Sequence, residues 1–423
     1  MRIALLCNDT RGGVQPYVAL GLGLRQAGHE VRAVAPSDLA GFFAAVGIPV
    51  TPLSGSIEAV LRGSGGVAER GLLATMRFAA QEMPARLREW TRCTLDACDG
   101  ADMLSGGVGG MVIGLSVAEK LGKPFVQTHL QPVGAPTGAY PGVLAAGLPQ
   151  WVGPWGRRLS HHVSEAIVWA PFKRAMATAR RQTLGLTGAP NPLTATPILY
   201  GFSPHVLPVW PPTANAGERV RQRHVTGYWV SPRPSEWSPS PALDAFLRRP
   251  GPVISIGFGS MASRDPGALT LLVRQAARDA GVRLVMLCGW GGLQNTQGDD
   301  DCHCADAIDH DGLFARVAAV VHHGGAGTTG AALMAGVPAL VVPFTMDQPF
   351  WGWRVAALGV GPEPIPRRRL NRRNLAAALR RMLDDETMRR RAAELGQLVR
   401  AEDGVSRAVE VFGRIDMRGL RGC

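Results

Sequence analysis

The sequence lacks a long apolar segment and any regular spacing of cysteine. No apolar run reaches the roughly 18 residues that a membrane-spanning helix needs, which argues against an integral membrane protein. The seven cysteines form an odd and irregular set, and residues Met1–Cys7 run directly into a predicted strand rather than a secretory signal. Both features favour a reducing compartment, so we expect a cytoplasmic protein.

Aromatic residues are also scarce, at 6% of the chain, whereas hydrophobic residues make up 46% of its 423 positions. A chain of this length and composition can build two or three domains with sizeable cores. Ten of the aromatic residues are tryptophans, and several lie between Trp151 and Trp237. This apolar, Trp-bearing middle could contact a membrane surface or a lipophilic ligand.

Acidic residues are outnumbered, and the formal charge is +12. Such an excess is compatible with nucleic-acid binding. The basic residues are scattered, however, and much of the excess is Arg in the last sixty residues, on predicted helix faces. We therefore expect a solvated, Arg-rich surface and no nucleic-acid partner.

The first half of the chain alternates apolar runs with helical patterns. The opening βαβαβ pattern predicts strands at 3–7, 30–35 and 48–53 and helices at 14–27 and 37–46. Such a pattern is typical of a doubly wound parallel sheet. After a Gly- and Ser-rich loop at 54–70, we expect helices at 71–98 and 110–121 and strands at 102–104 and 124–127.

The middle of the chain is broken by proline and glycine. Residues 131–156 and 187–217 cannot be single regular elements. Between them we expect a helix at 159–184, and after them a strand at 224–229. Residues 231–239 are polar and proline-stiffened, as expected of a linker.

A second αβ series follows the linker. Its predicted strands are 253–258, 282–287, 319–321 and 339–342, its helices 266–280, 351–358, 371–383 and 386–412, and its polar loop 294–307. The fold class is therefore α/β, with two Rossmann-like domains facing each other across a cleft lined by strand carboxyl ends. We assign the first domain to 1–230, a linker to 231–241, the second domain to 242–400, and a tail at 401–423 that packs back on the first domain.

One glycine-rich stretch carries the clearest chemistry. A buried strand ends at His322 and His323, and the helix that follows opens with a turn made by Gly324, Gly325, Gly327 and Thr328. Unpaired amides at a helix amino end favour an anion such as phosphate. The next strand delivers Asp347 and Gln348 to the same sheet edge. A diphosphate beside a hydroxyl-rich group, as in a nucleotide-sugar, suits this pair of clusters.

A metal site is a weaker reading of the acidic run Asp299–Asp301, which Cys302, His303 and Cys304 follow. The run lies in the predicted polar loop, and its spacing fits no standard zinc pattern. We therefore predict no metal.

Several segments together resemble a known family. They are Thr10–Pro16, Thr128–Pro132, Leu199–Pro204, Val225–Trp229, Ile256–Met261, Gly289–Gly291 and Leu313–Pro366, and the most specific is HHGGAGTT with the later PFTMDQPFW. The chain resembles family 1 glycosyltransferases with the two-domain B-type fold. Within them it is similar to the branch of sterol glucosyltransferases and bacterial antibiotic glycosyltransferases, which act on macrolides, glycopeptides and polyketides.

The resemblance implies a hexosyltransferase that moves a sugar from a UDP- or dTDP-sugar to a hydroxyl, with inversion and without metal or other cofactor. The implied acceptor is lipophilic. We place an antibiotic or polyketide aglycone first, because the composition is rich in Arg, Ala and Gly, and a sterol or lipid second. The contrasting class is a catalytically degenerate homologue that activates another glycosyltransferase. A monomer and a homodimer both remain open.

The resemblance also implies roles for individual residues. His322 would contact the diphosphate and stabilise its departure, while Asp347 and Gln348 would bind sugar hydroxyls. The full donor set would be Arg11, Gly12, Ser260, Trp290, Ile308, His322, Gly324, Gly325, Gly327, Thr328, Asp347 and Gln348. His129 and Trp151 are the candidate acceptor-binding residues.

One position departs from the family. Relatives commonly carry an aspartate where this chain has Gly13, and that aspartate takes the acceptor's proton. Three readings follow: Asp9 or His129 replaces it as base, the acceptor is an easily deprotonated phenol or thiol, or the chain is inactive. Asp9 is favoured by its loop position and His129 by its ordinary pKa.

Overall fold

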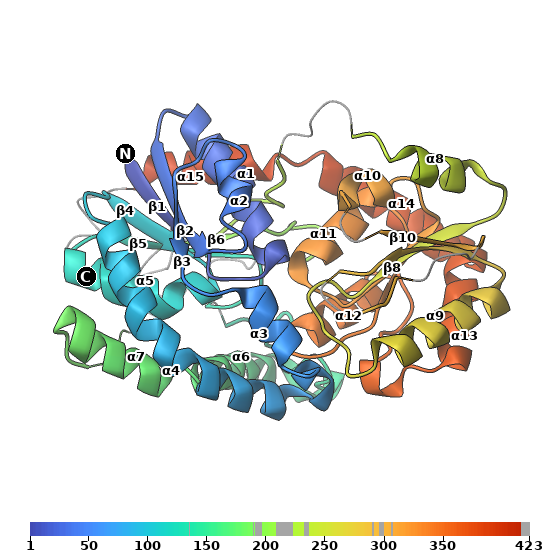
Figure 1. The fold of residues 1–423 in the computed structure, drawn as a ribbon, viewed down its shortest axis with the longest axis horizontal. Coiled ribbons are helices and arrows are strands. Elements are labelled where there is room, and N and C mark those ends of the chain that lie inside the picture. Colours follow the sequence, from blue (N-terminus) through green and yellow to red (C-terminus); the bar gives the residue numbers. More distant parts are fainter. Residues whose placement is uncertain are drawn as a thin grey trace. The chain divides into compact units, whose positions relative to one another are not determined.

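The computed structural model describes residues 1–134, 136–188, 190, 197–208, 223–231, 237–289, 292–295, 300–305 and 308–415. The chain divides into two compact units. Unit 1 comprises Met1–Ile57, Met76–Pro232 and Glu402–Cys423, and unit 2 comprises Glu58–Thr75 and Arg233–Ala401. Each unit contains one parallel sheet flanked by helices, which confirms the predicted α/β class (Figure 1).

The sheet of unit 1 has the order β3-β2-β1-β4-β5-β6-β7. Every neighbouring pair is parallel, as expected for strands joined by crossover connections. Its strands are β1 (Arg2–Leu6), β2 (Glu30–Pro36), β3 (Val50–Leu53), β4 (Met103–Gly106), β5 (Phe125–His129), β6 (Ile198–Tyr200) and β7 (Arg223–Val225). Apolar side chains of the central strands are almost fully buried, which explains their near-continuous apolar sequence.

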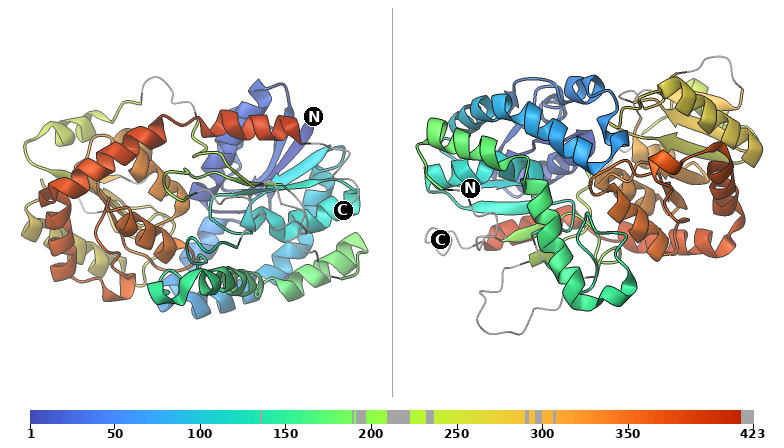
Figure 2. Two further views of the ribbon diagram at one scale, coloured as in Figure 1. Left: turned by 180° about the vertical axis from the view of Figure 1, so that it is seen from behind. Right: turned by 90° about the horizontal axis from the view of Figure 1, so that it is seen from below.

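Helices cover this sheet, and one of them comes from the end of the chain. The helix α15 (Gly404–Arg414) packs against α1 (Arg11–Gln26), with Val405 seated on Gly23. Figure 1 shows red α15 beside blue α1, and Figure 2 shows the same pair from behind. The other helical elements are α2 (Gly41–Ala44), α4 (Leu72–Ala97), α5 (Val108–Leu121), η2 (Gln150–Val152), α6 (Gly153–Trp169), α7 (Lys173–Ala179) and the π-helical turn η3 (Arg180–Leu184).

The sheet of unit 2 has the order β10-β9-β8-β11-β12, again all parallel. Its strands are β8 (Val253–Gly257), β9 (Arg283–Leu287), β10 (Cys302–Ala305), β11 (Ala319–His322) and β12 (Ala339–Val341). The helices α9 (Pro266–Ala280) and α13 (Arg372–Asp384) lie side by side and close one core (Figure 1). The remaining elements are α3 (Ile57–Gly63), η1 (Val67–Arg70), α8 (Pro241–Arg248), α10 (His310–Phe314), α11 (Ala326–Ala335), α12 (Gln348–Ala357), η4 (Arg367–Arg369) and α14 (Glu386–Arg400).

Five sequence predictions need correction. The predicted helix 386–412 is two helices, α14 and α15, because Asp403 caps a new helix through the Ser406 amide. Residues 302–305 form the edge strand β10 rather than part of a loop, because an edge strand can keep polar residues half-exposed. The predicted helix 159–184 is broken at 170–172, where Pro171 follows α6. The helix α1 begins at Arg11, so two glycines lie in its first turn. The predicted loop 54–70 contains α3 and η1. Among the described helices, none combines the length and apolarity that crossing a membrane requires.

Candidate functional site

The turn between β11 and α11 in unit 2 is built around Gly324. Its φ of 92° lies in the left-handed region, and a Cβ there would come within 2.6 Å of Val341 Cγ1 and 2.9 Å of the Gln348 carbonyl oxygen. Only glycine fits such a position. The residue before the helix, Gly325, supplies no side-chain cap to α11. The first amides of this 10-residue helix therefore offer a place for an anion.

His322 is buried at the end of β11, with 1% of its surface exposed. Its Nδ1 accepts a hydrogen bond from the Gly324 amide at 3.1 Å, which places the ring proton on Nε2. Among the described residues, Nε2 has no partner. Burial lowers the pKa of His322 to about 3, with His323 and His310 adding to the effect. The ring is thus a neutral donor with one proton to offer.

His323 is a second candidate that the sequence reasoning did not assign to the donor set. Its ring lies between two glycines, because a Cβ on Gly259 would fall 2.8 Å from its Cε1 and a Cβ on Gly325 2.5 Å from its Nε2. Its Nδ1 is buried and has no partner in the described part of the chain. Burial lowers its pKa to about 4, with His310 contributing. The glycines on both sides of the histidine were the signal that could have revealed it.

Other predicted donor residues surround this turn. Ser260 is half-buried and follows Gly259 after β8, a strand that pairs directly with β11 through Gly257 and His322. Gly327 and Thr328 lie half-buried in the first turn of α11. Ile308 is half-buried just before α10, and Trp290 lies outside the described residues.

The side chains of Asp347 and Gln348 shape the loop after β12. Gln348 is 5% exposed, and its Oε1 accepts from the amides of Phe344 (2.8 Å) and Thr345 (3.2 Å). Its Nε2 donates to Met261 Sδ at 3.3 Å. Asp347 Oδ2 accepts from the Trp351 indole at 3.1 Å. These contacts fix both side chains on the carboxyl side of the sheet.

Met346, just before them, has a φ of 57°. It is the one non-glycine residue in the left-handed region among those that the structure describes. This conformation costs roughly 1–2 kcal/mol for a residue with a Cβ. Such strain gathers at functional loops.

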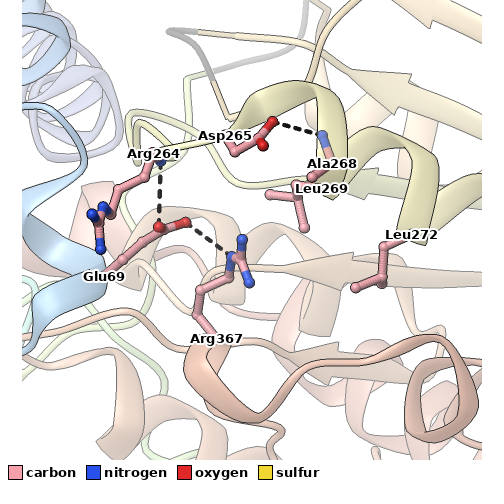
Figure 3. Close-up of a pocket in the computed structure, with 7 residues that line it drawn as sticks. All are labelled: Glu69, Arg264, Asp265, Ala268, Leu269, Leu272 and Arg367. Carbon is pink, nitrogen blue, oxygen red and sulfur yellow. Dashed lines mark hydrogen bonds and ion pairs between the residues drawn. The ribbon is translucent and has the colours of Figure 1, made fainter.

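A cavity in unit 2 lies away from these residues. It has a volume of about 430 Å³ and is lined by Glu69, Arg264, Asp265, Ala268, Leu269, Leu272 and Arg367 (Figure 3). Glu69 accepts from Ser263 Oγ at 2.8 Å and from the Arg264 amide at 3.3 Å, and forms an ion pair with Arg367 Nε at 3.0 Å. None of the predicted donor residues lines it, and we interpret Glu69 as a link between two loops of unit 2.

In unit 1, the Asp9 carboxyl group lies directly over Gly13. A Cβ built on Gly13 would be 2.3 Å from Asp9 Cγ. Asp9 Oδ1 accepts from the Thr10 amide at 2.6 Å, and burial raises the pKa of the carboxyl above its usual 3.8. Nearby, the Arg11 guanidinium lies 5.3 Å from the centroid of the Phe42 ring. Gly12 is exposed, with open space beside its Cα.

His129 is 1% exposed at the end of β5. Its Nε2 is 3.0 Å from Gln127 Oε1, and its Nδ1 has no partner among the described residues. Burial lowers its pKa to about 3. A ring of such low basicity is a weak proton acceptor at neutral pH. Trp151, the other candidate acceptor residue, is 86% exposed on η2.

No group of three or more His, Cys, Asp or Glu side chains suited to a metal ion occurs in the described ranges. Asp299 lies outside them.

Comparison with known proteins defines the class. The family model of the C-terminal domain of erythromycin biosynthesis protein CIII-like proteins matches residues 297–409. The glycotransferase of kitacinnamycin has a TM-score of 0.69 at 18% identity, over 98% of both chains. The glycosyltransferase VinC, solved in complex with dTDP, has a TM-score of 0.65 at 19% identity, over 98% of this chain and 99% of that one. The fold is that of the B-type glycosyltransferases, as the sequence predicts.

Two relatives that share more than 30% identity with this chain identify its family. UGT80B1 of Arabidopsis thaliana, a sterol 3-beta-glucosyltransferase, is 32% identical over 98% of this chain and 68% of its own length. The sterol 3-beta-glucosyltransferase of Emericella nidulans is 34% identical over 98% of this chain, which spans 30% of that relative's length. The chain therefore belongs to the glycosyltransferase family that contains the sterol 3-beta-glucosyltransferases.

Proposed function

We propose that this chain transfers a hexose from a UDP- or dTDP-sugar to a hydroxyl of a lipophilic acceptor, with inversion and without a metal ion. The observation that carries the proposal is the pair of buried histidines at the amino end of α11, each with a ring nitrogen that has no partner among the described residues. Ser260, Gly324, Gly325, Gly327 and Thr328 complete the proposed diphosphate site. Asp347 and Gln348 are the proposed sugar-binding residues, with Ile308 and Trp290 beside the base.

The chemistry requires stabilisation of a leaving nucleoside diphosphate. As the bond between the anomeric carbon and the diphosphate oxygen breaks, negative charge grows on that oxygen. The Nε2–H of His322 and the first amides of α11 are donors already fixed in place by burial and by the Gly324 turn. Preorganised donors of this kind stabilise the developing charge. Their arrangement supports a reaction that needs no metal.

The acceptor must lose a proton as its oxygen attacks the anomeric carbon. We assign that proton to Asp9. Burial weakens the hydration of its carboxylate and raises its basicity, whereas His129 is a weak base. Asp9 also projects from the start of α1, where Arg11 and Gly12 of the proposed donor set lie. With Asp9 as the proposed base, the reaction does not need a carboxylate at position 13, where this chain has Gly13.

For the acceptor, the relatives favour a sterol over an antibiotic or polyketide aglycone, which is the opposite of the order that composition suggested. The curated relatives at 32–34% identity are named as sterol 3-beta-glucosyltransferases. The solved structures of the kitacinnamycin glycotransferase and of VinC are 18–19% identical and therefore bear on the fold alone. We propose a sterol-like polycyclic alcohol as acceptor, and an antibiotic or polyketide aglycone as the second candidate.

The experiment is a matrix of donors and acceptors. UDP-glucose and dTDP-glucose are each incubated with a sterol and with a polyketide aglycone, and products are identified by mass spectrometry. We expect a glucoside with at least one pairing. If neither donor is transferred or slowly hydrolysed, the alternative of a non-catalytic activator of another glycosyltransferase gains support.

A further inference from the structure

In unit 1, the helix α6 buries a face of small and polar residues and exposes a face of large apolar residues. Its buried residues are mostly small or polar: Gly156, Ser160, His161, Ser164 and Val168. Large apolar side chains at every fourth position face outward: Trp151, which precedes the helix, is 86% exposed, Trp155 76%, Leu159 46% and Val163 51%. Trp155, Leu159 and Val163 are spaced four apart on α6 and therefore share one helix face, while Trp151 lies just before them in η2, ahead of Gly153 with its φ of 68°. We call these four residues the α6 face.

Hydrogen bonds hold the helix in this orientation. Ser160 Oγ accepts from the Gly142 amide at 2.8 Å, and Ser164 Oγ accepts from the Leu144 amide at 3.3 Å. His161 Nε2 lies 3.1 Å from the Tyr140 carbonyl oxygen, a distance that fits donation from the ring. Rotating the helix to bury the tryptophans would break all three contacts. The apolar face is therefore fixed outward by the packing of unit 1.

Such a grouping is unusual on this chain. Of the seven large apolar residues exposed in the described part, four belong to the α6 face, and the other three, Leu73, Leu271 and Leu398, are far apart in sequence. Scattered apolar residues are ordinary on a surface, whereas a contiguous apolar strip marks an interaction site.

The segment that carries the α6 face is strongly basic. Residues 150–190 contain six basic residues, Arg157, Arg158, Lys173, Arg174, Arg180 and Arg181, and one acidic residue, Glu165. Glu165 accepts the Gly134 amide at 2.8 Å, and Arg180 is buried against Glu119. Arg158, Lys173, Arg174 and Arg181 are exposed along α6, α7 and η3, the green elements of Figure 2. Exposed tryptophans on a basic segment complement an anionic surface with an apolar interior.

We propose that the α6 face docks on an anionic phospholipid membrane. Tryptophan is enriched where headgroups meet acyl chains, and an amphipathic helix with basic flanks lies in that plane. Basic side chains near the surface add attraction for anionic headgroups. The inference stands on exposure and charge alone and does not depend on the proposed transfer reaction.

The test is sedimentation of the full chain with vesicles of phosphatidylcholine, alone or mixed with phosphatidylglycerol. We expect binding to the mixed vesicles that weakens as salt rises. The double variant Trp151→Ser/Trp155→Ser should bind on the order of tenfold or more weakly. Arg158→Gln/Lys173→Gln should lose binding to the mixed vesicles selectively. Leu73→Ser and Leu271→Ser remove apolar residues exposed elsewhere and should bind as the unaltered chain does.

Circular dichroism and thermal melting of each variant confirm that its fold is intact. Three results would each overturn the proposal. The first is a failure of the unaltered chain to bind mixed vesicles, and the second is equal binding by the double Trp variant. The third is a concentration-dependent dimer in analytical ultracentrifugation that the double Trp variant abolishes, because the α6 face would then be an interface between two copies.

Discussion

The carboxyl group of Asp9 occupies the space that a side chain on Gly13 would fill. A Cβ at position 13 would lie 2.3 Å from Asp9 Cγ and 2.4 Å from its Oδ2. A carboxylate therefore reaches the same place from the preceding loop, and the glycine is what leaves room for it. This relationship connects the missing aspartate at position 13 to the presence of Asp9.

Asp9→Asn should lower the rate of sugar transfer by roughly 100-fold or more, because the amide cannot take a proton. The same variant should raise the melting temperature at neutral pH, since the half-buried Asp9 carboxyl has a raised pKa in the fold and destabilises the fold as pH rises and the group ionises. In the unaltered chain, the acid limb of kcat/KM should lie above pH 3.8, the ordinary pKa of Asp.

The exchange of the two positions is the sharper control. Asp9→Ala/Gly13→Asp should recover more activity than Asp9→Ala, because it restores a carboxyl where relatives carry one. Gly13→Asp alone should be impaired, since it crowds the Asp9 side chain. Equal activity of Asp9→Asn and the unaltered chain would remove Asp9 from the reaction and favour an acceptor that ionises by itself.

Stability should fall on acidification because of buried histidines. Burial lowers the pKa of His129 and His322 from 6.5 to about 3, and of His161 and His323 to about 4. The unfolded chain takes up these protons near pH 6.5, whereas the folded chain does not. The stability that the neutral histidines permit is thus full above pH 6.5 and is lost as pH falls from 6.5 toward about 3.

Urea denaturation across that pH range measures the effect. We expect a steep fall in the free energy of unfolding, and a shallower one for His161→Gln. A pH-independent free energy of unfolding would contradict the account.

His322→Ala and His323→Ala should each slow sugar transfer by roughly a hundredfold or more, because both rings lie buried at the amino end of α11. His303→Ala, on the edge strand β10 with its ring 5.7 Å from that of Phe246, is the matched control and should retain activity. Single-turnover kinetics separate this loss from slow product release. Unchanged rates in both His322→Ala and His323→Ala would place the diphosphate elsewhere.

Met346→Gly should raise the free energy of unfolding by roughly 0.5–1 kcal/mol. Glycine relieves the strain at φ 57° but adds freedom to the unfolded chain. Met334→Gly, in the last turn of α11, is the contrasting variant and should cost up to about 1 kcal/mol. A loss of stability in Met346→Gly comparable to that in Met334→Gly would show that the Met346 side chain is needed for packing.

The sequence predicts the central strands well because buried parallel strands are continuous apolar runs with glycine or polar residues at their ends. β8, β9 and β11 are examples. It does not reveal β10, whose polar residues read as a loop until they pair with β9. The turn between β11 and α11 is predictable because its glycines and histidines are close together in sequence. The closeness of Asp9 to Gly13 is not, since it depends on α1 beginning at Arg11.

The α6 face shows a different limit. From the sequence, its tryptophans can be read equally well as core residues or as part of a pocket wall. That the small, polar residues Ser160 and Ser164 lie on the buried side of the helix becomes clear only in the folded structure. Burial of Ser160 and Ser164 through hydrogen bonds to a loop 18–20 residues away decides the orientation. Such pairing between a helix and an irregular loop leaves no periodic pattern in the sequence.

The proposed reaction is a nucleotide-sugar transfer that depends on protein hydrogen-bond donors rather than on a metal ion. The most direct measurement is release of nucleoside diphosphate from UDP-glucose or dTDP-glucose in the presence of a sterol acceptor and EDTA, for the unaltered chain and for His322→Ala. We expect acceptor-dependent release of nucleoside diphosphate that EDTA does not suppress in the unaltered chain and that is lost in His322→Ala. Release abolished by EDTA, or equal in the variant, would contradict it.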